Sequence, residues 1–135
     1  MTVTLGASRV TLADVVAVAR DGAKVALAPE VVPRLAAARA VVERLARTGA
    51  PIYGVNSALG ANVGQPIEEA DLETFQASAI RARAVGVGPS YDAASVRAML
   101  FARIASLAVG GAGVSPAVVE ARLPRSQKVI AGSWL

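Results

Sequence analysis

The sequence predicts a mainly α-helical fold with a short extended segment near residues 24–27. Over four long stretches, apolar residues recur at steps of three and four, which is the spacing of one face of a helix. Gly or Pro residues follow these stretches closely, as is typical of helix ends. Neither an internal repeat nor a linker is evident, so we expect one helical unit.

The first predicted helix covers residues 12–20. Thr11 is its expected N-cap, and Asp14 lies in its first turn, where a carboxylate interacts favourably with the helix dipole. One side of this helix carries the apolar residues Leu12, Val15, Val16 and Ala19. Residues 24–27 then form the expected extended segment, which Pro29 ends.

The second predicted helix, residues 29–48, has the clearest apolar spacing in the chain. Gly49 is placed to cap it, and Pro51 prevents it from continuing. The residues expected on its apolar face are Val31, Leu35, Ala38, Val42 and Leu45.

The third predicted helix begins near the acidic residues Glu68, Glu69 and Asp71 and ends at about Ala84. Its expected buried residues are Leu72, Phe75, Ala79 and Ile80. Gly86, Gly88 and Pro89 prevent its continuation.

The fourth predicted helix covers residues 92–109, with Ser90 or Asp92 as its cap. Its apolar face is expected to hold Val96, Leu100, Arg103 and Leu107. A guanidinium at Arg103 would then need a carboxylate or backbone carbonyls to offset its desolvation, either in an ion pair between helices or at an anion site. Glycines after this helix end it, and Pro116 can start another.

Composition limits the chemistry that this chain can perform. Cysteine and histidine are both absent from its 135 residues, which excludes disulfides, thiolate or imidazole metal ligands, and Ser-His or Cys-His catalysis within the chain. Any acid or base must therefore be Tyr, Lys, Asp or Glu. We expect no metal.

The apolar fraction of 54% and the mean hydropathy of +0.50 are high for a soluble monomer of this size. We therefore expect an oligomer or a missing remainder to cover part of the surface. The uncharged apolar stretch of residues 104–119 is too short to span a bilayer, and no secretion signal is visible. These features favour a cytoplasmic protein without a membrane partner.

The stretch between the second and third helices, residues 53–66, has the composition of an irregular loop. It holds three Gly, two Asn, one Pro and a single tyrosine, Tyr53. A polar loop with one phenol, held between apolar helices, is a place to look for chemistry, although a Tyr beside glycines is more often a packing or turn residue.

Residues 53–60, Tyr-Gly-Val-Asn-Ser-Ala-Leu-Gly, resemble the tyrosine loop of the aromatic amino acid ammonia-lyases and aminomutases, whose pattern is Tyr-Gly-x-Asn-Thr-Gly-Phe-Gly. Two later stretches, 84–88 and 96–108, agree with that family in order and spacing. The resemblance covers about residues 2–122. The departures from the family pattern are Ser57, Ala58 and Leu59, where Thr, Gly and Phe are usual.

The resemblance implies the N-terminal helical domain of the ammonia-lyase fold over residues 1–122, followed by a divergent tail at 123–135. It implies a carbon–nitrogen lyase that eliminates ammonia from histidine, phenylalanine or tyrosine, as in histidine catabolism, and leaves an arylacrylate. Such enzymes are homotetramers that use a methylidene-imidazolone, formed by cyclisation of an internal Ala-Ser-Gly. The tyrosine reaches the active site of a neighbouring subunit.

The resemblance also implies roles for individual residues. Tyr53 corresponds to the catalytic acid or base, and Asn56 and Gly60 correspond to residues that shape the substrate pocket. Ala82 and Arg83 occupy the positions of the substrate-selectivity pair, which is commonly Ser-His, Phe-Leu or His-Leu. Arginine fits none of these patterns, so Arg83 either points away, bonding the last carbonyls of its helix, or favours an acidic or hydroxylated substrate.

The chain contains no Ala-Ser-Gly triplet, and residues 131–133 hold the same residue types in the wrong order, Ala-Gly-Ser. Cyclisation needs the Gly nitrogen placed to attack the Ala carbonyl across the Ser. After Arg122 the resemblance also stops, which is typical of a truncation or an altered reading frame. We therefore expect an N-terminal lyase fragment that is inactive alone and needs a complementing lyase chain or a longer product.

Three other functions stay open at this point. An aminomutase shares the same motifs. A non-catalytic helical interaction module would keep the scaffold without the chemistry, as the departures at Ser57, Ala58, Leu59 and Arg83 mildly suggest. The net charge of +4 and the pI of about 10.3 invite a nucleic-acid function, but the 14 Lys and Arg residues form no basic run and no aromatic stacking set accompanies them.

Overall fold

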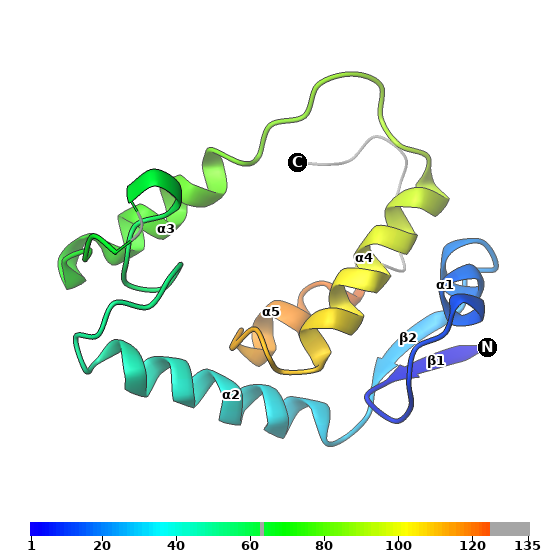
Figure 1. The fold of residues 1–135 in the computed structure, drawn as a ribbon. Coiled ribbons are helices and arrows are strands. Elements are labelled where there is room, and N and C mark those ends of the chain that lie inside the picture. The colour runs from blue at the N-terminus through cyan, green and yellow to red at the C-terminus, as the bar shows by residue number, and fades with distance from the viewer. Residues whose placement is uncertain (63, 125–135) are drawn as a thin grey trace. The chain divides into compact units, whose positions relative to one another are not determined.

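A computed structural model describes residues 1–62 and 64–124 (Figure 1). The described part is mainly helical, as predicted, with two short strands. Most of the predicted tail, residues 125–135, lies outside the described residues. The described residues divide into two compact units, one formed by residues 1–40 and 90–124 and the other by residues 41–89.

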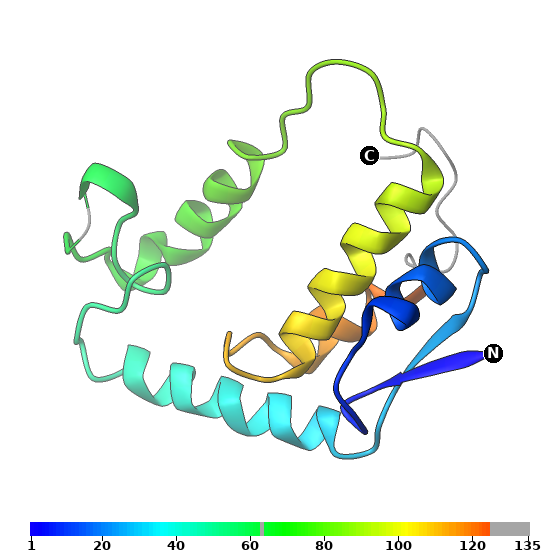
Figure 2. The ribbon, with the colours of Figure 1, turned by 45° about the vertical axis from the view of Figure 1, so that its right-hand side comes forward.

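The first unit begins with a short parallel strand pair. Strand β1 (Thr2–Leu5) pairs with β2 (Lys24–Leu27), and helix α1 (Leu12–Ala19) connects them (Figures 1 and 2). The extended segment at 24–27 is confirmed, whereas β1 was not predicted. Its alternation of exposed Thr with buried Val3 and Leu5 is a strand pattern, but four residues are too few to recognise it from sequence.

Helix α1 buries only part of the predicted side. Ala19 is buried and Val15 is half-buried against the core, as predicted, whereas Leu12 is 85% exposed and Val16 is also exposed. Ala17 and Val18 are buried in addition, because α1 is apolar almost all round and spacing alone does not reveal which side meets a neighbour.

Helix α2 (Val31–Ala46) confirms the second predicted helix, and only the first part of its apolar face is buried. Val31 and Leu35 have no exposed surface, Ala38 and Val42 are half-buried, and Leu45 is 43% exposed. The predicted burial of Leu45 was wrong, since the core against which the helix packs covers only its first two turns.

Helix α4 (Ala93–Ala108) packs against α1, as both ribbon views show (Figures 1 and 2). Arg103 was predicted to lie in the apolar face of α4, but it is exposed. The expectation of a buried guanidinium was therefore wrong. Val96 and Leu107 are buried as predicted, and the buried face also includes Phe101, Ile104 and Ala108. Apolar residues extend beyond the predicted face of α4, and packing against α1 decides which of them are covered.

A short helix, α5 (Pro116–Glu120), follows α4 and packs against it. Pro116 is its first residue, as predicted, and Ser115 is its N-cap. The core of the first unit joins buried residues from all of its elements: Val3, Leu5, Ala17, Val18, Ala23, Val25, Ala28, Val31, Leu35, Phe101, Ile104, Leu107, Ala108 and Val119.

Acidic residues cap the amino ends of α1 and α4. Thr11 and Asp14 form a reciprocal capping box, and Asp92 accepts hydrogen bonds from the backbone nitrogens of Ala94 and Ser95 at 2.9 and 3.0 Å. The pKa of Asp14 is lowered mainly by the hydrogen bond from the Thr11 hydroxyl. The pKa of Asp92 is lowered mainly by the bond from the Ser95 hydroxyl.

Arginine side chains bind the carboxyl ends of α1, α4 and α5. Arg97 donates from Nε and Nη2 to the Ala19 carbonyl oxygen at 2.9 and 2.6 Å, so α4 holds the end of α1. Arg34 on α2 donates to the Ala108 oxygen at 3.1 Å, and Arg122 donates to Val118. These cations face carbonyls that helices leave unpaired and that carry partial negative charge.

The second unit holds the end of α2, two single-turn helices (Gly60–Asn62 and Glu69–Asp71) and α3 (Leu72–Arg81). Helix α3 contains no fully buried residue. Leu72, Phe75 and Ala79 are half-buried, and Ile80 is 70% exposed, so its predicted burial was wrong. The face exists as predicted, but residues 41–89 supply too little apolar surface to cover it.

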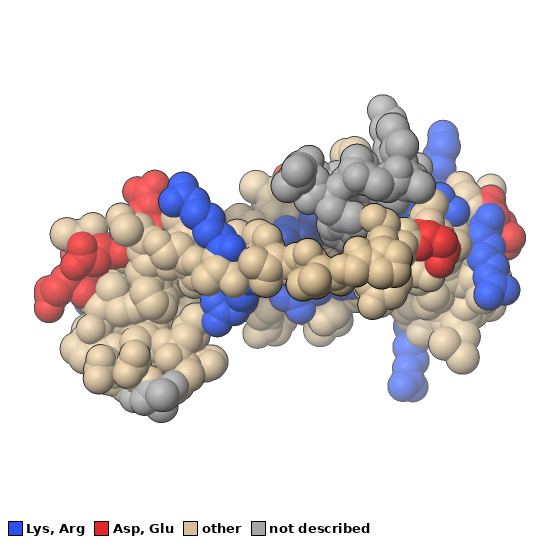
Figure 3. Space-filling model, turned by 90° about the horizontal axis from the view of Figure 1, so that it is seen from above, with Lys and Arg blue, Asp and Glu red and all other residues tan. Residues whose placement is uncertain are grey.

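Charged side chains are spread over the surface. On the face in Figure 3, blue and red residues are interspersed with uncharged surface. No helix of the described residues is both long and apolar enough to cross a membrane. In the same residues, no three carboxylates lie close enough together to hold a metal ion.

Replacing Arg97 with Met should lower the free energy of unfolding by about 1–2 kcal/mol, because the Ala19 oxygen loses a charged donor while the aliphatic stem is kept. Arg103→Met is the matched control on the same helix and should change the free energy of unfolding by less than about 0.5 kcal/mol. Urea denaturation followed by circular dichroism measures both. Equal effects of the two variants would show that the bond to Ala19 adds no stability.

Gly6→Ala should destabilise the first unit by about 2–4 kcal/mol, from two causes. Gly6 has a φ of +97°, and an added Cβ would overlap the Val31 side chain. Gly22→Ala isolates the backbone effect, since Gly22 has a φ of +68° with open space around it, and should cost only about 1–2 kcal/mol. A Gly22 variant as unstable as the Gly6 variant, in the same urea assay, would count against the overlap with α2.

Candidate active site

Tyr53 lies at the corner of a tight turn. The Val55 nitrogen donates to the Ile52 carbonyl oxygen at 3.0 Å, Gly54 has a φ of +75°, and no non-glycine residue with positive φ is found in the described chain. Tyr53 thus precedes a glycine in the left-handed region, as in a type II turn. The Tyr53 side chain is 65% exposed, so its hydroxyl is accessible outside the turn.

The Asn56 side chain stabilises this turn through two hydrogen bonds to its backbone. Its Oδ1 accepts from the Ile52 nitrogen at 2.6 Å, and its Nδ2 donates to the Ala50 oxygen at 3.0 Å. The side chain is nearly buried, at 9% exposure. Its amide therefore joins the two ends of residues 50–56 and fixes the approach of the chain to Tyr53.

The rest of the loop closes on itself through its backbone. Ala58 donates to the Gln65 oxygen at 2.9 Å, and Ile67 donates to the Asn56 oxygen at 3.0 Å. Ser57 is buried at 2% exposure. Gly60 opens a single helical turn with a φ of +65°, where a side chain would meet no neighbour, so its contribution here is its backbone conformation.

A residue missed in the sequence, Gln76, joins α3 to the turn. Its Nε2 donates to the Gly54 oxygen at 3.1 Å and to the Val55 oxygen at 3.3 Å. Gln76 follows Leu72 by one helical turn, so it is a polar residue at the edge of the predicted apolar face of α3. That break in the apolar pattern is the signal that could have identified it.

The predicted selectivity pair, Ala82 and Arg83, lies at the carboxyl end of α3. Ala82 is the C-cap residue, and its nitrogen donates to the Ser78 oxygen at 2.9 Å. The Arg83 guanidinium donates to the Ala79 oxygen at 2.8 Å, so Arg83 bonds a carbonyl of the last turn, one of its two predicted positions. Both residues are exposed.

The structure therefore groups the predicted site residues in one unit. Tyr53, Asn56 and Gly60 belong to one loop, and Gln76 connects this loop to the helix that ends at residues 82–83. The arrangement presents one phenol on a braced turn. Such a group can accept or donate a proton at a substrate placed beside it.

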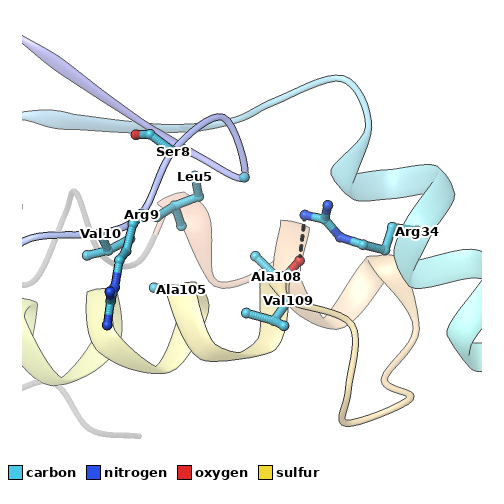
Figure 4. A pocket seen from close by; sticks show the side chains of 9 residues that line it. Leu5, Ser8, Arg9, Val10, Arg34, Ala105, Ala108 and Val109 are labelled. Carbon is cyan, nitrogen blue, oxygen red and sulfur yellow. Dashed lines mark hydrogen bonds between the residues drawn. The ribbon is translucent and has the colours of Figure 1, made fainter.

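A separate cleft of about 470 Å³ lies in the first unit, with no predicted site residue among its lining. Its polar side chains are Ser8, Arg9 and Arg34, over an apolar floor. Figure 4 shows Arg9 extended across α4, away from Arg34, and Arg34 directed at the Ala108 oxygen, so their guanidinium groups do not converge. The cleft lacks the convergent polar groups of a catalytic site.

A sequence profile of the family described as aromatic amino acid lyase matches residues 10–128. Histidine ammonia-lyase from Streptomyces avermitilis is 40% identical over 119 residues, which make up 88% of this chain and 23% of that protein. The chain thus spans about a quarter of the length of the curated relatives it matches.

Solved structures agree with this match. Tyrosine aminomutase from Streptomyces globisporus is similar with a TM-score of 0.88 and 26% identity, over 95% of this chain and 24% of that one. Phenylalanine aminomutase from Pantoea agglomerans gives a TM-score of 0.84 and 30% identity, over 93% of this chain and 24% of that one. The chain belongs to the aromatic amino acid lyase family, as its tyrosine loop predicted.

Asn56→Ala should release the tyrosine turn. The variant leaves the Ile52 nitrogen and the Ala50 oxygen without their side-chain partner, at a cost of about 1–3 kcal/mol. We expect the Ile52 amide proton to exchange with solvent at least ~10-fold faster. Asn62→Ala, at an exposed position of the same loop, should leave that rate unchanged. Unchanged Ile52 protection in Asn56→Ala would contradict the bracing role.

Proposed function

We propose that this chain provides the tyrosine-loop portion of an aromatic amino acid ammonia-lyase, with Tyr53 as the acid or base at the substrate. The observation that carries the proposal is the exposed Tyr53 on a turn braced by Asn56, in a chain of this family. A fixed turn places the phenol reproducibly, and exposure leaves it free to meet a substrate held outside residues 41–89.

The remaining site residues have supporting roles in this proposal. Asn56 and Gly60 shape the loop, the former through its amide bonds and the latter through its positive φ. Ala82 and Arg83 occupy the positions of the family's substrate-selectivity pair. Because Arg83 already bonds Ala79, we propose that it ends the helix and makes no contact with the substrate.

This chain lacks the residues from which the electrophile of this family forms. A methylidene-imidazolone forms from an Ala-Ser-Gly triplet, and none occurs in the 135 residues. We propose that sequence outside this chain supplies the group, as part of a longer product or on a complementing lyase chain in a cytoplasmic homo-oligomer. The chain alone is then inactive.

Histidine is the first substrate to test, because the histidine ammonia-lyase from Streptomyces avermitilis is 40% identical to this chain. An aminomutase is the second candidate, since solved aminomutases match the fold with TM-scores of 0.84 and 0.88. Both reactions require the same proton transfer at the loop tyrosine, so residues of this chain do not separate them.

A chimera tests the proposal. We would replace the matched segment of the Streptomyces avermitilis enzyme with residues 10–128 of this chain and measure ammonia and arylacrylate from His, Phe and Tyr, with the β-amino acid as the aminomutase product. The chimera should turn over, and its Tyr53→Phe variant should lose about 10²–10⁴-fold in kcat. Tyr91→Phe is the control and should keep full activity.

Two outcomes would contradict the proposal. A chimera that assembles normally but forms no product would show that this segment does not support the chemistry. Ammonia release by the isolated 135-residue chain would show that the reaction does not need an electrophile supplied by sequence outside this chain.

A further inference from the structure

Gln76 is the side chain through which α3 holds the tyrosine turn. One nitrogen, Nε2, donates to two successive carbonyl oxygens, Gly54 at 3.1 Å and Val55 at 3.3 Å. Those carbonyls belong to the two residues that follow Tyr53. Over residues 1–62 and 64–124, these are the side-chain hydrogen bonds that the structure shows between α3 and the turn.

The contact requires a side-chain donor. The carbonyl oxygens of Gly54 and Val55 only accept, and the two hydrogens on Gln76 Nε2 allow it to donate one to each. Glutamate at this position has the same shape but, when ionised, has no hydrogen to donate. Leucine is similar in size and has no polar group.

Packing alone does not fix the position of the turn against α3. The helix buries no residue fully, and its large apolar side chains Leu72 and Phe75 are only half-buried. Apolar contacts are non-directional, whereas the two bonds from Gln76 specify which atoms of the turn face the helix. The Gly54 backbone, at a φ of +75°, holds the corner between Tyr53 and these carbonyls.

We propose that Gln76 is a positioning residue that fixes Tyr53 relative to the Ala82–Arg83 end of α3. Gln76 precedes Ala82 by six residues, about 9 Å along the helix, so one rigid element carries both the anchor of the tyrosine turn and the selectivity pair. Gln76 does not touch the reacting atoms. Its effect on catalysis rests on the function proposed above, whereas its effect on the Tyr53 position does not.

The first test uses the 135-residue chain and nuclear magnetic resonance. The variants are Gln76→Leu and Gln76→Glu, and Gln65→Glu is the matched control at an exposed loop position. The carbonyl ¹³C resonances of Gly54 and Val55 report the two hydrogen bonds directly. They should shift in both Gln76 variants and stay unchanged in the control, with the helical circular dichroism retained in all three.

The same samples report the position of Tyr53. The chain has no cysteine and only two tyrosines, so a single spin label at Ser78→Cys, an exposed position on α3, broadens ring signals that are simple to assign. The broadening of the Tyr53 ring should change at least twofold in both Gln76 variants and not in the control. Unchanged carbonyl shifts and unchanged broadening would overturn the positioning role.

The second test places Gln76→Leu and Gln65→Glu in the active chimera. Misplacing Tyr53 should lower kcat at least tenfold, with a smaller change in KM, because in the proposed function Tyr53 acts on the reacting atoms in the transition state. A variant chimera with normal kcat would overturn the catalytic part of the inference. If the chimera with Gln76 intact were inactive, the proposed function would fail, and the resonance experiment would still decide the positioning role.

Discussion

The bond between an arginine side chain and the carboxyl end of a helix is the interaction on which much of this structure depends. Arg97 joins α4 to the end of α1, and Arg34 joins α2 to the end of α4. In the first unit these bonds tie together helices that are distant in sequence. The small core would otherwise have only non-directional apolar contacts to set their positions.

The same interaction accounts for part of the basic composition. The ends of α1, α3, α4 and α5 each receive an arginine, from Arg97, Arg83, Arg34 and Arg122 respectively. A carbonyl partner satisfies the donors but leaves the positive charge uncompensated, which contributes to a net charge of +4. In the second unit, side-chain amides perform the comparable task, with Asn56 and Gln76 holding the tyrosine turn from two directions.

The sequence predicted the elements better than their faces. Thr11, Asp92 and Pro116 marked helix starts correctly, because caps act locally. Arg103 and Leu45 were assigned to buried faces that the fold leaves exposed, since spacing identifies an apolar side but not the neighbour that covers it. The loop of Tyr53 was located from its composition and resemblance, whereas Gln76 required coordinates, because its partners are 21 and 22 residues away.

The two ends of the helices differ in the kind of group that caps them. Asp14 and Asp92 cap amino ends with carboxylates, and the pKa of each in the fold lies below the ordinary 3.8. The stability that these ionised caps give to the folded chain is therefore complete above pH 3.8. It is lost as the pH falls through the lowered pKa values. At the carboxyl ends of α1 and α4 the capped groups are backbone carbonyl oxygens, which do not titrate in this range. Acid therefore weakens the carboxylate caps at the amino ends of these two helices and leaves the carbonyl acceptors at their carboxyl ends unchanged.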